Sequence, residues 1–146
     1  NKQSNKNEIR LLFLGDEGVG KTSIIHYIVT DMFPKNVKKV FKTTTLDSDL
    51  YLLESNQKTV LVDSSTNRDH TQQTDVEIER ASVIILVYDV NNFDIVKRLR
   101  TVWLPRIVKL NEKVPIILCG NKMDLRSSNS EGELESLLTP CVMEFR

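Results

Sequence analysis

The sequence GDEGVGKTS at Gly15–Ser23 constrains the possible fold more than any other stretch of this chain. It follows the apolar run Ile9–Leu14, which is typical of a buried strand, and it leads into Thr22–Val29, whose apolar residues recur at helical spacing. A Gly-x-x-x-x-Gly-Lys-Thr loop in this context turns its backbone N–H groups toward phosphates at the positive end of a helix. Lys21 would add a charge at the terminal phosphates, as a candidate catalytic residue, and the Thr22 hydroxyl would ligate Mg²⁺. The candidate phosphate-binding residues are Glu17, Gly18, Val19, Gly20, Lys21, Thr22 and Ser23.

Further apolar runs alternate with helical patterns along the rest of the chain. Continuous apolar runs at Ser82–Tyr88 and Val114–Cys119 predict strands covered on both faces. Helical patterns are predicted at Val96–Leu110, where Pro105 kinks or breaks the helix, and at Glu133–Phe145. We therefore expect an α/β fold of the P-loop NTPase type, with a mostly parallel sheet and helices on both faces.

One antiparallel pair is expected in this sheet. Leu50–Leu53 and Thr59–Val62 are two short strand-like runs, and Ser55-Asn56-Gln57 between them has turn chemistry. This arrangement predicts a β-hairpin.

Length and charge limit the classes of function. The chain has 146 residues, which suits one domain, and its formal net charge is zero. Nothing in that balance indicates a nucleic-acid partner or direct contact with an anionic membrane. Cys119 and Cys141 lie far apart and are expected to be free thiols. The polar residues 1–7 are expected to form a flexible lead-in to a domain at residues 8–146.

The stretch GNKMDL at Gly120–Leu125 directly follows a predicted buried strand. The Asp124 carboxylate can accept two hydrogen bonds from the N1 and N2 donors of guanine, which adenine lacks. The stem of Lys122 can cover the flat base, and Asn121 can connect this base loop to the phosphate loop. The pattern predicts a site that selects guanine.

Together, the phosphate loop and Asn-Lys-x-Asp resemble the Ras superfamily of small GTPases. Phe33 matches the aromatic residue that packs edge-on against guanine in that superfamily. Softer motifs, VYDVNN at Val87–Asn92, WLP at Trp103–Pro105 and LTP at Leu138–Pro140, are similar to the N-terminal GTPase domain of the Miro (mitochondrial Rho) family. The resemblance implies a guanine-nucleotide switch that binds GTP or GDP with Mg²⁺. Its partners would be regulator and effector proteins that contact the switch segments.

The resemblance also assigns metal ligands. Asp63, at the end of the run Thr59–Val62, corresponds to the acid that holds Mg²⁺, facing Thr22. The alternative is that Asp63 caps a helix or closes a turn. A threonine of the first switch should also reach Mg²⁺; Thr43, Thr44 and Thr45 are candidates, and Thr44 is the one we select.

The second switch departs from the family pattern. Asp63-Ser64-Ser65-Thr66-Asn67 stands where Asp-Thr-Ala-Gly-Gln is usual. Thr66 replaces a flexible glycine, and Asn67 replaces the glutamine that orients the attacking water. Asn67 is thus a weak catalytic candidate, and slow hydrolysis of GTP is expected. The alternatives are a pseudo-GTPase that only binds nucleotide and a diverged Ras- or Rab-like GTPase.

Glu17 occupies a phosphate-loop position that is usually glycine in the family. Its carboxylate either crowds or attracts an incoming arginine finger, or it points to solvent.

The resembled fold continues with a sixth strand and a final helix after the segment LLTPCVMEFR. We therefore expect residues 8–146 to be a domain that is incomplete at its C-terminal end. If its parent is Miro-like, the protein is expected on the cytoplasmic face of the mitochondrial outer membrane.

Overall fold

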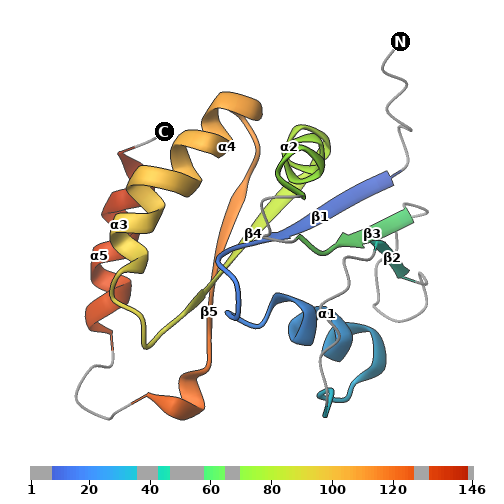
Figure 1. The fold of residues 1–146 in the computed structure, drawn as a ribbon, viewed down its shortest axis with the longest axis horizontal. Coiled ribbons are helices and arrows are strands. Elements are labelled where there is room, and N and C mark those ends of the chain that lie inside the picture. Colours follow the sequence, from blue (N-terminus) through green and yellow to red (C-terminus); the bar gives the residue numbers. More distant parts are fainter. Residues whose placement is uncertain (1–7, 36–42, 47–57, 65–69, 127–131, 145–146) are drawn as a thin grey trace.

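The computed structural model describes residues 8–35, 43–46, 58–64, 70–126 and 132–144, with the side chains of 43–46 excepted. Within these ranges the chain forms one sheet flanked by helices on both faces (Figure 1). No helix in the described part of the chain combines the length and apolar character that a bilayer crossing requires.

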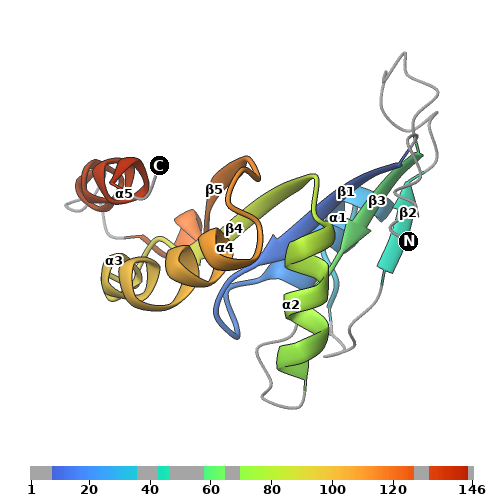
Figure 2. The same cartoon turned by 90° about the horizontal axis from the view of Figure 1, so that it is seen from above.

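The sheet has five strands within the described residues, in the order β2-β3-β1-β4-β5. The strands are β1 (Glu8–Leu14), β2 (Thr43–Leu46), β3 (Lys58–Val62), β4 (Val83–Asp89) and β5 (Ile116–Asn121). Strands β3, β1, β4 and β5 are parallel, while β2 runs antiparallel to β3. Figure 2 shows this order running along the molecule, with β2 at the end opposite α5.

Two strand predictions need correction. The antiparallel partner of β3 within the described residues is Thr43–Leu46, whereas the predicted Leu50–Leu53 strand and its turn lie outside them. The predicted strand Val114–Cys119 begins later, at Ile116, and extends to Asn121. Pro115 has no N–H to donate and only accepts from Ile84, so the parallel ladder starts after it.

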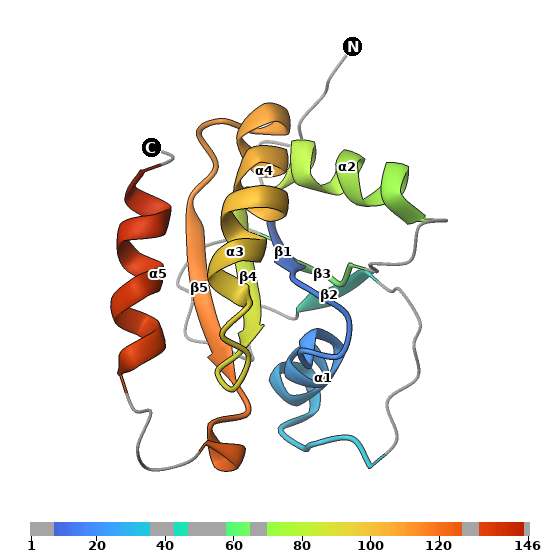
Figure 3. The same cartoon turned by 60° about the vertical axis from the view of Figure 1, so that its left-hand side comes forward.

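The helices are α1 (Lys21–Thr30), α2 (Thr71–Arg80), α3 (Ile95–Arg98), α4 (Leu104–Leu110) and α5 (Glu133–Met143), with a π-helix η2 (Leu99–Trp103) and a 3₁₀ turn η3 (Met123–Leu125). Helix α1 lies on one side of the strands and α2 and α4 lie on the other (Figure 1). In Figure 3, α5 stands beside β5. The sequence reading did not identify α2, because TQQTDVEIER carries only two large apolar residues, Val76 and Ile78.

Pro105 interrupts the long helix in a specific way. The predicted helix Val96–Leu110 is present as α3, η2 and α4, with the π-helix directly before Pro105. The pyrrolidine ring cannot donate to the preceding turn and would clash with its carbonyl, which the wider π turn relieves. Leu99 and Trp103 are both buried across this turn.

Two apolar clusters hold these elements together. The larger one joins the strands to α2, α3, α4 and α5, with Leu12, Ile78 and Leu138 among its buried members. The smaller one lies between the sheet and α1 and includes Phe13 and Ile25. The carboxyl ends of the parallel strands are thereby fixed at one edge of the sheet, where ligands of α/β proteins bind.

Candidate nucleotide-binding site

Residues that directly follow β1, β3 and β5 lie at the carboxyl ends of these parallel strands and are connected by hydrogen bonds. They bring together the phosphate loop, Asp63 and the base loop, which are separated in the sequence but joined by hydrogen bonds. The sequence motifs therefore belong to one place in the structure.

The phosphate loop needs glycine where it approaches its neighbours. Gly20 has φ of 100°, and a Cβ there would lie 2.3 Å from Asn121 Nδ2. A Cβ on Gly15 would lie 2.2 Å from the Val87 carbonyl oxygen. Helix α1 begins directly after Gly20, and no side-chain hydrogen bond caps it. No such cap therefore competes with an anion for the N–H groups of the first turn.

Lys21 is buried, with its ammonium turned back into the phosphate loop. Nζ donates hydrogen bonds to the carbonyl oxygens of Gly15 and Asp16, each at 2.8 Å. Burial lowers the pKa of Lys21, while the nearby carboxylates of Asp63, Asp16 and Glu17 oppose that shift. The charge is thus held at a fixed point inside the loop.

Asp63 and Thr22 lie in direct contact. Thr22 Oγ1 donates to Asp63 Oδ2 at 2.5 Å, and the backbone N–H of Ser64 donates to Oδ1 at 2.9 Å. Burial raises the pKa of Asp63, opposed by the hydrogen bond from Thr22 and the charge of Lys21. The N-cap of α2 is His70, so Asp63 does not cap that helix.

A hydroxyl and a carboxylate side by side fit a magnesium ion. Mg²⁺ sites in nucleotide-binding proteins use one or two protein oxygens, with phosphates and waters completing the octahedron. Thr22 and Asp63 supply such a pair next to Lys21.

The base loop is tied to the phosphate loop at two points. Asn121 Nδ2 donates to the Val19 carbonyl at 2.9 Å, which confirms the connection expected from the sequence. Lys122 Nζ donates to the Gly18 carbonyl at 2.7 Å and lies 3.6 Å from Asp89. Asp124 follows in η3, with an exposed side chain.

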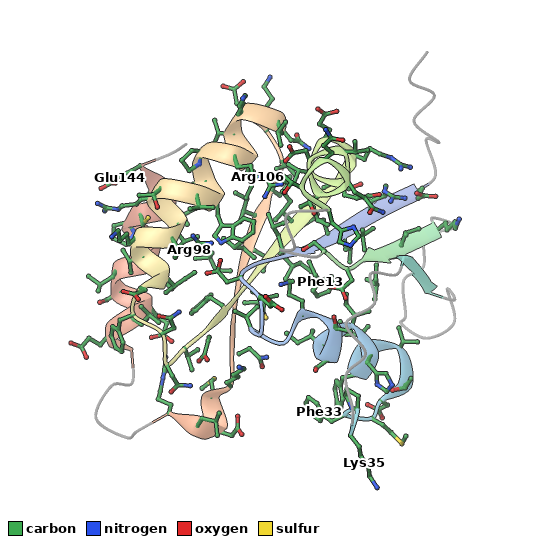
Figure 4. All side chains as sticks on the ribbon, viewed as in Figure 1. Phe13, Phe33, Lys35, Arg98, Arg106 and Glu144 are labelled. Carbon is green, nitrogen blue, oxygen red and sulfur yellow. The ribbon has the colours of Figure 1, made fainter. Side chains whose placement is uncertain are left out.

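Other candidate residues lie around these loops. Phe33, labelled in Figure 4, is 73% exposed. Its ring stacks on that of Tyr27, with ring centroids 4.6 Å apart. Glu17 is exposed, and its negative charge opposes the lowering of the Lys21 pKa. Ser23 lies in the first turn of α1.

The switch residues are described only in part. Thr66 and Asn67 lie outside the described residues. The candidate threonines Thr43, Thr44 and Thr45 lie in β2, where only their backbone is described. Thr43 pairs with Val62, so this end of β2 lies beside the end of β3 that Asp63 follows.

Sequence reasoning missed three side chains at this edge. Asp89 receives hydrogen bonds from Asn91 and faces Lys122, and Ser64 Oγ donates to the Phe13 carbonyl at 2.6 Å. Arg98 binds Asp16 of the phosphate loop. Asp89 could have been found, because it directly follows a predicted buried strand, as Asp63 does; Arg98 carries no such signal.

Comparisons with known proteins agree with the resemblance that the sequence motifs indicate. The model of the Ras family matches residues 10–136. The chain is 32% identical over 138 residues to Mitochondrial Rho GTPase 1 of Arabidopsis thaliana and 34% identical over 142 residues to Mitochondrial Rho GTPase 1 of Mycosarcoma maydis. It is 31% identical over 141 residues to Mitochondrial Rho GTPase 2 of Arabidopsis thaliana.

These alignments cover 94%, 97% and 97% of this chain but 21%, 19% and 22% of the three relatives. The chain therefore spans about a fifth of the length of the curated relatives it matches. The resemblance to the Ras superfamily and to mitochondrial Rho GTPases, expected from the motifs, is confirmed.

Proposed function

Because this chain belongs to the Ras family, we propose that it is a guanine-nucleotide switch that binds GTP and GDP with Mg²⁺ and hydrolyses GTP slowly. The observation that carries the proposal is the double connection between two loops, from Asn121 to Val19 and from Lys122 to Gly18. One loop has the chemistry that binds phosphates, and the other has the chemistry that selects guanine. Held at a fixed separation, they suit the two ends of one nucleotide.

At the phosphate end, the chain's own groups bind and orient the substrate. The N-terminus of α1 and the Lys21 ammonium attract the phosphate oxygens. Thr22 and Asp63 would hold Mg²⁺, which when bound neutralises charge on the phosphates. Thr43 pairs with Val62, the last residue of β3, which directly precedes Asp63. This register favours Thr43 over Thr44 as the first-switch threonine nearest the metal.

At the base end, Asp124 selects guanine by accepting hydrogen bonds from its N1 and N2 groups. The Lys122 stem covers one face of the base, and its ammonium remains bound to Gly18. Phe33 supports the base edge-on, which its exposed ring permits. The site residues are thus Glu17–Ser23, Phe33, Asn121, Lys122 and Asp124, with Thr22, Asp63 and a switch threonine at the metal.

Hydrolysis is slow in this proposal because the second switch lacks two standard groups. Asn67 is one methylene shorter than the glutamine that orients water, and Thr66 has less backbone freedom than glycine. Glu17 adds an exposed carboxylate to the phosphate loop, which in this proposal either crowds or attracts a partner's arginine finger.

By its similarity to mitochondrial Rho GTPases, we assign the domain to a longer protein of that type at the cytoplasmic face of the mitochondrial outer membrane. Its nucleotide state would be read there by regulator and effector proteins through the switch segments. This assignment predicts that a fluorescent fusion of the full-length protein is found at mitochondria.

Identification of the bound nucleotide tests the proposal most directly. The protein is purified, its ligand is released by heat, and the ligand is analysed by mass spectrometry. We expect GDP or GTP, released also by EDTA, and slow single-turnover hydrolysis of added GTP. GTP that binds but remains intact indefinitely would make the domain a pseudo-GTPase. Failure to bind any guanine nucleotide at millimolar Mg²⁺ would refute the proposal.

A further inference from the structure

Arg98 contacts the phosphate loop from helix α3, which contains none of the sequence motifs. Its Nε lies 3.1 Å from Asp16 Oδ1 and 3.2 Å from Oδ2, and its Nη2 lies 2.5 Å from Oδ1. Oδ1 therefore accepts from both nitrogens of the guanidinium, while Oδ2 shares the Nε–H, so the ion pair is reinforced by charge-assisted hydrogen bonds. The Asp16 hydrogen bonds raise the pKa of Arg98.

Arg98 projects from a firmly placed helical segment. It is the last residue of α3 and is labelled in Figure 4. Its neighbours Ile95 and Leu99 are 3% and 0% exposed and belong to the main core. The position of α3 is thus determined by the core, so the helix can set the position of the loop.

Asp16 is held on its other side by the phosphate-binding lysine. The Asp16 carbonyl accepts a hydrogen bond from Lys21 Nζ at 2.8 Å, while its carboxylate receives Arg98. A shift of Asp16 would therefore move a carbonyl that positions the Lys21 ammonium.

Charge gives Arg98 a second effect. The Asp16 carboxylate acts electrostatically on Lys21, so it lies within reach of the phosphate site. Arg98 compensates this negative charge. Without Arg98, a bound phosphate chain would face an unpaired carboxylate, which opposes the binding of an anion.

We propose that Arg98 is a positioning residue of the nucleotide site, which fixes the phosphate loop through Asp16 and couples the position of α3 to the retention of nucleotide. The inference rests on the proposed guanine-nucleotide binding and adds a residue that no motif contains.

The competing interpretation is an ordinary surface ion pair. The side chains of Arg98 and Asp16 are 43% and 22% exposed, and exposed pairs contribute little to stability. Arg100 offers a matched control, because it lies on the next segment of the same helix and pairs with Glu144 away from the phosphate loop.

The test compares GDP dissociation from the parent, Arg98→Gln, Arg100→Gln and the double variant Asp16→Asn/Arg98→Gln, using a fluorescent GDP. We expect Arg98→Gln to accelerate dissociation about tenfold, within the range in which contacting residues couple. Arg100→Gln should leave the rate unchanged. The double variant should recover only the part of the loss that the unpaired charge causes, whereas the part caused by the lost contact with the loop should remain. Arg98→Lys keeps the charge without the planar guanidinium, and its GDP dissociation rate should lie between those of the parent and Arg98→Gln.

Thermal unfolding separates positioning from folding. In the absence of nucleotide, Arg98→Gln and Arg100→Gln should have similar melting temperatures, so a change in dissociation alone identifies positioning. Equal GDP dissociation in these two variants would overturn the proposal while leaving guanine binding intact.

Failure of the parent to bind GDP would instead overturn the proposed function. Hydrogen exchange then decides the positioning role by itself: the amides of residues 15–20 should exchange faster in Arg98→Gln than in Arg100→Gln. Equal exchange would reject it.

Discussion

Three side chains of the candidate site, Lys21, Asn121 and Lys122, donate to carbonyl oxygens of the phosphate loop. A short glycine-containing loop has little packing of its own, so such donors determine its shape. The residues that we propose contact the nucleotide and the residues that hold the loop are therefore partly the same.

At this scale, Asp124→Asn should weaken GTP binding and favour xanthosine nucleotides, because the amide presents donors where guanine needs acceptors. A reduction of about tenfold or more is expected, the loss of a charged hydrogen-bond pair. Competition binding with GTP and XTP measures it. Unchanged GTP affinity would mean that Asp124 does not read the base.

The second prediction concerns Asn67, which we propose is too short, by one methylene, to orient water. Asn67→Ala should change single-turnover GTP hydrolysis less than about twofold, whereas Thr66→Gly with Asn67→Gln should accelerate it at least tenfold, within the range of water-positioning residues. A large loss in Asn67→Ala would show that Asn67 already positions the water.

Between elements, an ion-pair network joins β1 to α2. Arg10 donates to Glu8 and to Glu77, each at 2.8 Å, and Lys58 lies 3.5 Å from Glu8. Such pairs align the first strand with the helix that follows the second switch.

This network predicts a pH dependence of stability. The hydrogen bond from Arg10 lowers the pKa of Glu8 below its ordinary value of 4.5, so folding favours the charged carboxylate. The stabilisation is complete above 4.5 and disappears as the pH falls through the lowered pKa. Urea unfolding at pH 7 and pH 3 should show that Glu8→Gln destabilises the protein more at pH 7 than at pH 3. Glu112→Gln, an exposed control, should have no effect at either pH; equal effects of the two substitutions would contradict the prediction.

Helix α5 depends on a narrow apolar stripe. Leu138 is 1% exposed in the main core, while its neighbour Leu137 is 50% exposed. Leu138→Ala should lower the free energy of unfolding by about 2–5 kcal/mol, the usual cost of a cavity. Leu137→Ala should cost at most ~0.5 kcal/mol, as surface substitutions do. Similar losses in both variants would show that α5 packs differently.

For the whole molecule, the two faces of the sheet are covered unequally among the described residues. The larger cluster lies under α2, α3, α4 and α5, whereas α1 covers the other face, where Ile117 on β5 is 55% exposed. Strand β5 is also at the edge of the described sheet, and exposed apolar edges favour association.

We therefore expect these 146 residues to self-associate weakly as their concentration rises, and Ile117→Lys to reduce the association. Val76→Lys, at an apolar residue that is 49% exposed on α2, is the control and should have no such effect. Sedimentation velocity across a concentration series measures this. A parent chain that stays monomeric throughout would contradict the prediction.

The sequence by itself determined the features that depend on local chemistry. The phosphate loop, the strand-end position of Asp63 and the Asn-Lys-x-Asp loop were all identified, because each requires particular residue types at fixed spacing beside an apolar run. The parallel sheet followed from the alternation of such runs with helices. Helix α2 was missed because its sequence is mostly polar and its place depends on packing of Ile78 against the sheet.

Only the tertiary structure decided how distant residues meet. Arg98 and Asp16 are 82 positions apart, and Lys122 and Gly18 are 104 apart, so no local pattern relates them. The pairing of β2 with β3 also required the fold, since backbone hydrogen bonds do not depend on side-chain identity and allow several registers. Local spacing thus predicts which groups a strand end or loop presents, while the packing of the core decides which of them come into contact.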